Sequence, residues 1–228
     1  MPSATLEEYL ETIYKLAERG EVRPAHLAEA MGVSGPTVTA TLKRLQAKGL
    51  ITRPDNGVAL TAMGASEAIS IVRRHRLAER FLVDALGLPW DEVHEEACRL
   101  EHALSPKVQT ALEVFLENPS FCPHGHPIPS SDGIVAPVGG EPLCDFAADS
   151  RVEILRVEDE DDSLLSYLAS LGMYPGTEVS VCDVAPFKGP LMIEVGQSRY
   201  ALGRDIASKI VVTPVVGPAK RSKRDSTK

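Results

Sequence analysis

The residues with the clearest chemical meaning form a short run of metal-ligand types at helical spacing. His94, Cys98, Glu101 and His102 are separated by four, three and one positions. A helix therefore places two imidazoles, a thiol and a carboxylate within about 100° of one face. All are ligand types for divalent transition metals. The run predicts a metal site, whereas any one of these histidines alone is more often an ordinary surface or core residue.

Two other predicted helices carry residues that can complete such a site. His75 and Glu79 are four residues apart, the spacing at which neighbours on a helix can share an ion. Glu8 and Glu11 share part of the surface of the first predicted helix and can close the site from the N-terminal side. Because ligand types converge from three helices, we expect a metal centre rather than unrelated polar residues.

The periodicity of apolar residues predicts the helices that must position these side chains. Ser34 is a plausible N-cap, and Pro36 is tolerated in the first turn of the helix that follows. The expected helices span residues 6–19, 24–31, 34–47, 62–86, 90–103 and 105–118.

The N-terminal part has the pattern of a winged DNA-binding module. The second and third predicted helices are short and joined by a turn containing Gly32, which indicates a helix-turn-helix. Strand-like runs at residues 50–53 and 58–61 flank Asn56-Gly57, the strongest local hairpin signal. We interpret this hairpin as the wing.

The third predicted helix carries the candidate DNA contacts. One stripe is apolar, whereas a neighbouring face carries hydroxyls and cations that suit phosphate contacts, and the helix N-terminus can approach base edges. The candidates are Ser34, Pro36, Thr37, Thr39, Thr41, Arg44 and Lys48. The alternatives are a helix-turn-helix used only for packing, or a solvated helix with ordinary surface charges.

The second half of the chain has a different composition. Residues 118–142 are rich in Pro, Gly, Ser and His, which indicates a linker. Strand-like runs at 150–157, 178–184, 191–195, 198–202 and 210–214, with one helix near 163–171, predict a small barrel. The expected domains are a winged helix at 1–64, a helical domain at 65–130, a linker at 131–149, a barrel at 150–216 and a disordered basic tail at 217–228.

Composition limits the class of protein. The 228 residues are 43% apolar and contain neither a long apolar run nor a signal-peptide pattern, so we expect a cytoplasmic globular protein. The net charge of −8 argues against coating nucleic acid by bulk charge, yet residues 30–54 carry four basic side chains and no acidic one. The four cysteines show no CxxC pair, so reduced thiols are expected.

Several segments together resemble the diphtheria-toxin-repressor family of iron- and manganese-dependent regulators, also called the DtxR/MntR family. The resemblance covers nearly the whole chain. Its motifs lie at residues 8–14, 33–38, 73–79, 93–102, 123–129 and 171–178. It implies a mainly α protein with a small β domain: a winged helix-turn-helix, a helical metal-binding and dimerisation domain, and an SH3-like (FeoA-like) barrel. It also implies a homodimer on double-stranded operator DNA.

The resemblance further implies two neighbouring metal sites. Cys98, Glu101 and His102 match the primary site, completed by a residue at the position of Glu8. His75, Glu79 and His94 match an ancillary site, which in longer members also takes ligands from the SH3-like domain. Here Asp161 or Asp162 is the candidate, and the sequence departs from the pattern at Leu164, where a second ligand is expected. His124 and His126 match turn residues, with metal ligation as the alternative.

The choice of metal depends on the first helix. Iron-dependent members of the family have a methionine where Glu8 stands, whereas manganese-dependent members have a carboxylate there and a glutamate matching Glu11. Hard oxygen donors favour Mn(II), although Cys98 keeps the site compatible with Fe(II). We therefore expect a manganese-responsive repressor with metal as corepressor, and an iron(II)-dependent repressor as the alternative.

Two other classes compete with a repressor. A metallohydrolase needs an open coordination position and a positioned acid or base, and its HExxH signature is absent from the sequence. A metal-storage or chaperone protein would have no use for the wing and recognition helix. We therefore expect no enzymatic activity.

Overall fold

The computed structural model describes residues 4–55, 57–159 and 161–215. The chain divides into two compact units. One comprises the chain up to Pro123 together with Pro127–Pro137, and the other comprises His124–His126 and the chain from Val138 onward.

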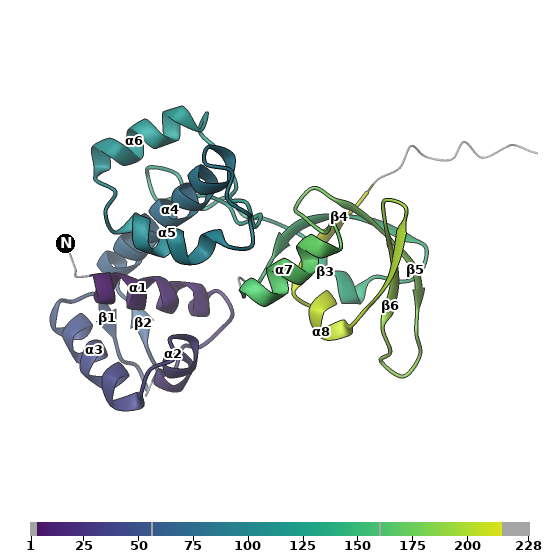
Figure 1. Cartoon of the computed structure of the whole chain (residues 1–228). Coiled ribbons are helices and arrows are strands. Elements are labelled where there is room, and N and C mark those ends of the chain that lie inside the picture. Colours follow the sequence, from purple (N-terminus) through teal and green to yellow (C-terminus); the bar gives the residue numbers. More distant parts are fainter. Residues whose placement is uncertain (1–3, 56, 160, 216–228) are drawn as a thin grey trace, which may run out of the picture. The chain divides into compact units, whose positions relative to one another are not determined.

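The first unit is built from helices and a short hairpin (Figure 1). Its elements are α1 (Ala4–Ala17), α2 (Pro24–Ala30), α3 (Gly35–Ala47), β1 (Ile51–Thr52), β2 (Ala59–Leu60), α4 (Ala62–Asp84), α5 (Val93–Glu101) and α6 (Pro106–Phe115). Each corresponds to a predicted element, but most are shorter by a few residues, because helix ends fray and carry weak sequence signals. His102 is the C-cap of α5 and not part of its regular helix.

The helix-turn-helix and wing are present as predicted. The Ser34 hydroxyl accepts a hydrogen bond from the Thr37 main-chain nitrogen at 3.4 Å, which makes Ser34 the N-cap of α3. Strands β1 and β2 pair antiparallel, and a bridge between Val22 and Val58 extends the pairing. Asn56, half of the predicted hairpin signal, lies outside the described residues.

One apolar core joins the helix-turn-helix and the hairpin to the long helix α4. It contains residues from α1, α2, α3, the wing and the start of α4, including Leu10, Leu42, Val58 and Ile71. Gly64 permits a close approach, since a Cβ there would stand 1.8 Å from the Leu50 carbonyl oxygen. Because α1 and α4 pack into the same core as α3, the predicted metal ligands on α1 and α4 are connected through packed side chains to the predicted recognition helix.

The second unit is a six-stranded antiparallel sheet with order β3-β8-β4-β5-β6-β7 (Figure 1). Its elements are β3 (Glu141–Pro142), a 3-10 turn (Leu143–Asp145), β4 (Ser150–Val157), α7 (Asp162–Ser170), β5 (Glu178–Val184), β6 (Leu191–Val195), β7 (Ser198–Leu202), α8 (Arg204–Ala207) and β8 (Ile210–Pro214). Alternating residues such as Val152 and Ile154 are fully buried.

The five predicted strands of this unit have the expected bounds, because each is a clear run of β-forming residues. The short elements β3 and α8 carry too little periodicity to predict. Residues 141–145, which the sequence assigns to the linker, form β3 and the 3-10 turn, and Leu143 is fully buried. None of the helices in the described ranges combines the length and apolar character needed to span a bilayer.

Candidate metal centre

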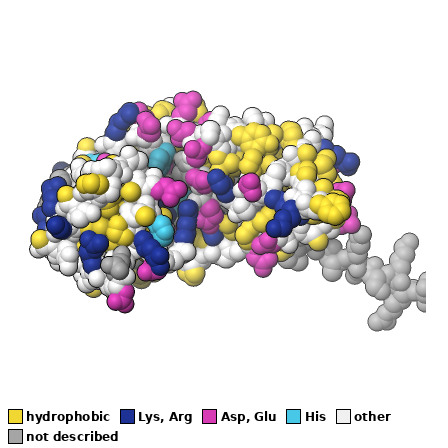
Figure 2. Space-filling view, turned by 90° about the horizontal axis from the view of Figure 1, so that it is seen from below, with side chains coloured by type: hydrophobic (Ala, Val, Ile, Leu, Met, Phe, Trp, Pro, Cys, Tyr) yellow, Lys and Arg dark blue, Asp and Glu magenta, His cyan; other side chains and the backbone are white. Residues whose placement is uncertain are grey.

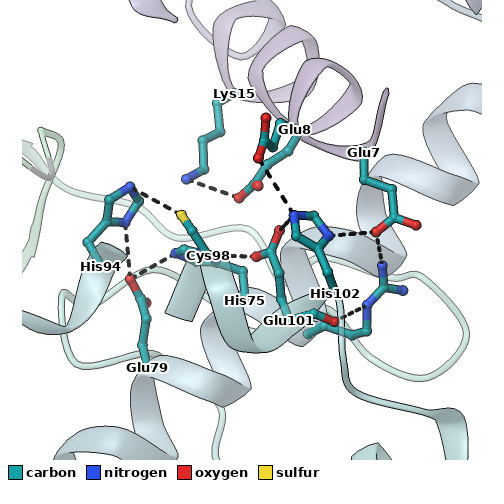
Figure 3. A network of polar contacts seen from close by, with 11 residues as sticks. Glu7, Glu8, Lys15, His75, Glu79, His94, Cys98, Glu101 and His102 are labelled. Atoms are coloured by element: carbon teal, nitrogen blue, oxygen red, sulfur yellow. Dashed lines mark hydrogen bonds and ion pairs between the residues drawn. The ribbon is translucent and has the colours of Figure 1, made fainter. Parts of the chain in front are cut away.

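His75 of α4 lies at the centre of the polar cluster in the first unit (Figure 3). Its Nδ1 is 2.7 Å from Oε2 of Glu101, and its Nε2 is 3.0 Å from Oε1 of Glu79. Side-chain exposure is at most 1% for all three residues. Burial by itself would lower the pKa of His75, but the charges of Glu79 and Glu11 raise it well above its ordinary value. The buried carboxylates of Glu79 and Glu101 thus both depend on the imidazole of His75 as a positive partner in the protein interior.

The thiol of Cys98 connects His75 to His94. Its Sγ lies 3.9 Å from Nδ1 of His75 and 3.8 Å from Nε2 of His94. Burial raises the pKa of Cys98, yet hydrogen bonds with the two imidazoles outweigh it and lower that pKa overall. A thiol that releases its proton more readily is a better metal ligand. The three donor atoms lie within 4.8 Å of one another, close enough to hold one ion.

A second set of donors lies between α1, α4 and α5. One donor atom each from Glu11, His75 and Glu101 lie within 4.8 Å of one another, and all three residues are buried. Burial, followed by the charge of Glu11, raises the pKa of Glu101. Glu11 also forms an ion pair with Lys15 at 3.2 Å. His75 belongs to both donor sets. The residues that the sequence assigns to the primary site and those that it assigns to the ancillary site therefore lie next to one another in the structure.

His102 faces the carboxylates of two helices. Its Nε2 lies 3.5 Å from Oε1 of Glu101 and 3.9 Å from Oε1 of Glu8. The Glu8 side chain is 50% exposed and lies at the edge of the cluster, whereas Glu101 is buried. The structure therefore brings Glu8 from α1 to the predicted ligands of α5 (Figure 3).

Glu7 is a site residue that the sequence reasoning missed. Its side chain is 8% exposed, and its Oε2 lies 2.9 Å from Nδ1 of His102 and 2.9 Å from Nη2 of Arg74. The signal was present, because Leu10 and Tyr14 stand three and seven residues after Glu7 on the apolar face of α1.

The donor chemistry fits a divalent cation. Three buried carboxylates, from Glu11, Glu79 and Glu101, lie next to the imidazole of His75. Oε1 of Glu101 and Nε2 of His102 are both shielded from solvent, and neither makes a hydrogen bond within the described residues. Buried carboxylates beside an unsatisfied imidazole nitrogen are costly in an apolar interior, and a bound dication compensates them. Carboxylate, imidazole and thiolate donors together suit manganese or iron.

The remaining predicted ligand and the two turn histidines belong to the second unit. Asp161 is exposed and caps α7, since its Oδ1 accepts a hydrogen bond from the Leu164 main-chain nitrogen at 3.0 Å. The hydrogen bond from the Ser163 hydroxyl, followed by that from the Leu164 main-chain nitrogen, lowers the pKa of Asp161. His124 lies in a turn, as the sequence predicts, and Nε2 of His126 lies 2.9 Å from the Val157 carbonyl oxygen.

Most of the predicted DNA contacts lie on the exposed face of α3. Ser34, Pro36, Thr37, Thr39, Arg44 and Lys48 are exposed. Thr41 differs from the expectation: it is only 5% exposed, and its hydroxyl donates to the Thr37 carbonyl oxygen at 3.1 Å. Its position next to Leu42 and Leu45 turns it toward the core, so it is not available for phosphate. Figure 2 shows several Lys and Arg side chains on the lobe formed by the first unit.

Together the fold and the donor cluster define a class: a winged-helix DNA-binding protein whose recognition helix shares a core with helices that carry a divalent-metal donor set. Family models agree. Residues 1–58 match the N-terminal DNA binding domain of iron dependent repressors, and residues 61–130 match their metal binding and dimerisation domain. Residues 141–214 match the FeoA domain.

Characterised relatives extend over nearly the whole chain. The iron-dependent repressor IdeR of Mycobacterium tuberculosis is 39% identical over 230 residues, covering 92% of this chain and 97% of the relative. The diphtheria toxin repressor of Corynebacterium efficiens is 38% identical over 228 residues, covering 93% of this chain and 96% of the relative. The chain belongs to this family of metal-dependent transcriptional repressors and is not an enzyme; its domains indicate a homodimer that binds operator DNA.

Similar solved structures include regulators of both metals. A manganese-dependent transcriptional repressor in complex with manganese superposes with a TM-score of 0.85 at 33% identity, covering 92% of this chain and all of that one. IdeR of T. acidophilum gives a TM-score of 0.78 at 29% identity, covering 94% of this chain and all of that one. The family thus fixes a divalent metal corepressor without fixing which metal.

Proposed function

We propose that this protein is a manganese(II)-responsive repressor, in which the metal is the corepressor and a homodimer binds operator DNA to control genes of metal-ion homeostasis. The observation that carries the choice of metal is the carboxylate of Glu8, 3.9 Å from Nε2 of His102. It places a hard oxygen where the iron-dependent members of the family have a thioether. Buried Glu11 on the same helix adds a second oxygen donor.

The proposed ligands of the first unit come from α1, α4 and α5. Those on α1 are Glu8 and Glu11, and those on α4 and α5 are His75, Glu79, His94, Cys98, Glu101 and His102. Asp161 stays a prediction as a contribution of the second unit. A bound dication would supply the positive charge that compensates the carboxylates and the thiolate among these ligands.

Metal binding would act on DNA affinity through α1. This helix packs in the same core as α3 while its acidic side chains face α5, so fixing α1 against α5 fixes the orientation of the recognition helix. In a homodimer this selects conformations whose two recognition helices match successive half-sites. Exposed Arg44 and Lys48 would contact phosphates, and Ser34, Pro36, Thr37 and Thr39 lie where α3 can approach base edges and backbone.

Iron(II) is the second candidate, because the thiol of Cys98 is a softer donor and the iron-dependent repressor IdeR of Mycobacterium tuberculosis is 39% identical to this chain over 230 residues. The test is operator binding, measured by fluorescence anisotropy on the DNA upstream of the protein's own gene while Mn(II), Fe(II), Co(II) or Zn(II) is titrated.

The proposal expects Mn(II) to activate binding at lower free concentration than Fe(II). It also expects Glu8→Met to reverse that order by weakening Mn(II) about tenfold or more. Exposed Glu29→Gln on α2 is the matched control. Activation by Fe(II) ahead of Mn(II) in the parent protein would refute the choice of metal, and equal DNA binding with and without metal would refute the corepressor role.

A further inference from the structure

Glu7 contacts the nitrogen of His102 that lies away from Glu8 and Glu101. Its Oε2 lies 2.9 Å from Nδ1 of the imidazole and belongs to a buried side chain. A neutral imidazole carries a proton on only one nitrogen, and a carboxylate accepts but cannot donate. With Nδ1–H donated to Glu7, the lone pair of His102 resides on Nε2, which points toward Glu101 and Glu8 (Figure 3).

Arg74 of α4 holds Glu7 in that position. Its Nη2 donates to Oε2 of Glu7 at 2.9 Å, and its Nε donates to the main-chain carbonyl of Glu101 at 3.1 Å. Its Nη1 is 3.2 Å from the hydroxyl of Ser70, one turn earlier on α4. The guanidinium is therefore fixed on its own helix while it connects α1 to the backbone of α5, and its charge compensates that of buried Glu7.

Glu7 and Glu8 have different environments although they are adjacent. The side chain of Glu7 is 8% exposed and engaged with a cation, whereas that of Glu8 is 50% exposed and faces Nε2 of His102. Adjacent residues of a helix point in different directions. Glu7 therefore contacts Nδ1 of His102, whereas Glu8 lies on the side of Nε2, the nitrogen that would bind the metal.

We propose that Glu7 and Arg74 form a positioning pair: Glu7 sets the tautomer and orientation of His102 toward a divalent cation, and Arg74 joins α1, α4 and α5 around it. This inference rests on the proposed function in one respect, that His102 is a ligand. A carboxylate that accepts the second N–H of a metal-binding histidine fixes the ring and raises its basicity, and its loss typically costs about 10- to 100-fold in metal affinity.

The experiment compares the full-length protein with Glu7→Gln, Arg74→Gln and the control Glu29→Gln. The first readout is made on metal-free protein in chelator: the ¹⁵N shifts of the His102 imidazole, at a pH well above the ordinary histidine pKa of about 6.5. We expect an Nδ1–H tautomer in the parent and the control. In Glu7→Gln we expect a shift toward the Nε2–H form, which the neutral ring prefers in water.

The second readout is the dissociation constant for Mn(II) alone, from the electron paramagnetic resonance signal of the free ion. We expect it to rise about 10- to 100-fold in Glu7→Gln. We expect a similar or smaller rise in Arg74→Gln, where Glu7 remains but loses its clamp, and no rise in Glu29→Gln. The effects of Glu7→Gln and Arg74→Gln should be less than additive in the double variant, because both act through His102.

The outcomes separate this inference from the proposed function. An unchanged His102 tautomer in Glu7→Gln refutes the positioning role, even if Mn(II) binding is weakened, because Glu7 would then act as a direct ligand or only in folding. A changed tautomer with unchanged Mn(II) affinity also refutes it. If the parent binds Mn(II) poorly while the tautomer still depends on Glu7, the orientation holds and the choice of metal fails. Should Glu7→Gln not fold, Arg74→Gln decides by the same two readouts.

Discussion

Neutralising Glu101 should have little effect on the metal-free fold and a large effect on metal binding. The variant Glu101→Gln keeps the shape of a side chain that is 1% exposed. It weakens a charge-assisted hydrogen bond to His75, 2.7 Å long and worth about 1.5–3 kcal/mol. It also removes repulsion from Glu11, whose donor atom lies within 4.8 Å of that of Glu101. Two unit charges at about 4 Å interact by about 4 kcal/mol in a protein-like dielectric.

These two terms oppose each other, so the free energy of unfolding of the metal-free variant should stay within about 2 kcal/mol of the parent value. The loss of the Glu101 charge has no comparable compensating gain in the metal-bound protein. A dication interacts with a carboxylate twice as strongly as a unit charge does, and the amide oxygen recovers only part of that. We expect the affinity for Mn(II) to fall by at least about 100-fold, equivalent to about 2.7 kcal/mol.

The assays are isothermal titration with Mn(II) and thermal unfolding in chelator, followed by circular dichroism. Glu113→Gln is the matched control: its carboxylate is also partly buried and pairs with Arg73 at 2.7 Å, but on α6 and outside the donor cluster. It should lose some stability and no Mn(II) affinity. Unchanged Mn(II) affinity in Glu101→Gln would falsify its role as a ligand. A loss of several kcal/mol of metal-free stability would show that Glu101 is mainly structural.

Three further predictions concern stability and DNA binding. Because the pKa of His75 and that of Glu101 are raised in the folded state, the folded metal-free protein holds protons that the unfolded chain releases. The contribution of each group is complete below its unfolded pKa and is lost as pH rises through its folded pKa. The unfolded pKa is about 4.3 for a glutamate and about 6.5 for a histidine, so the melting temperature in chelator should begin to fall near pH 4.3 through Glu101 and fall further above about pH 6.5 through His75. Calorimetry that shows a flat or rising melting temperature across this range contradicts this. Gly64→Ala should cost more than about 3 kcal/mol in denaturant unfolding, because its Cβ would stand 1.8 Å from a carbonyl oxygen, whereas Gly35→Ala, with open space around its Cβ, should cost little. Arg44→Ala should weaken binding to operator and to shuffled DNA alike and reduce the slope of log affinity against log salt by about one unit; a loss confined to the operator would instead indicate base recognition.

Local sequence was sufficient for much of the architecture. The N-cap at Ser34, the wing around Gly57 and the five longer strands of the second unit are each specified by residues close together in the chain. Short elements such as β3 and α8 could not be predicted, because two to four residues carry no periodicity and β3 exists only through its pairing with β8.

For the candidate site, too, some features follow from the sequence alone and others only from the tertiary structure. The sequence by itself determined the ligand types and their helical spacing, since His94, Cys98, Glu101 and His102 are one helical face whatever the helix packs against. It also determined the acidic pair on α1, from which the preference for manganese is argued.

Only the tertiary structure decided how these residues are used. Periodicity could not tell that Thr41 turns into the core, nor that Glu7 is buried while Glu8 is half exposed, because burial depends on which element packs against each helix. It could not place His75 between Glu79 and Glu101, or bring Arg74 to Glu7 across 67 positions of sequence. Those contacts arise when α1, α4 and α5 pack together, and long-range packing sets which carboxylate orients His102 and which one stands on its coordinating side.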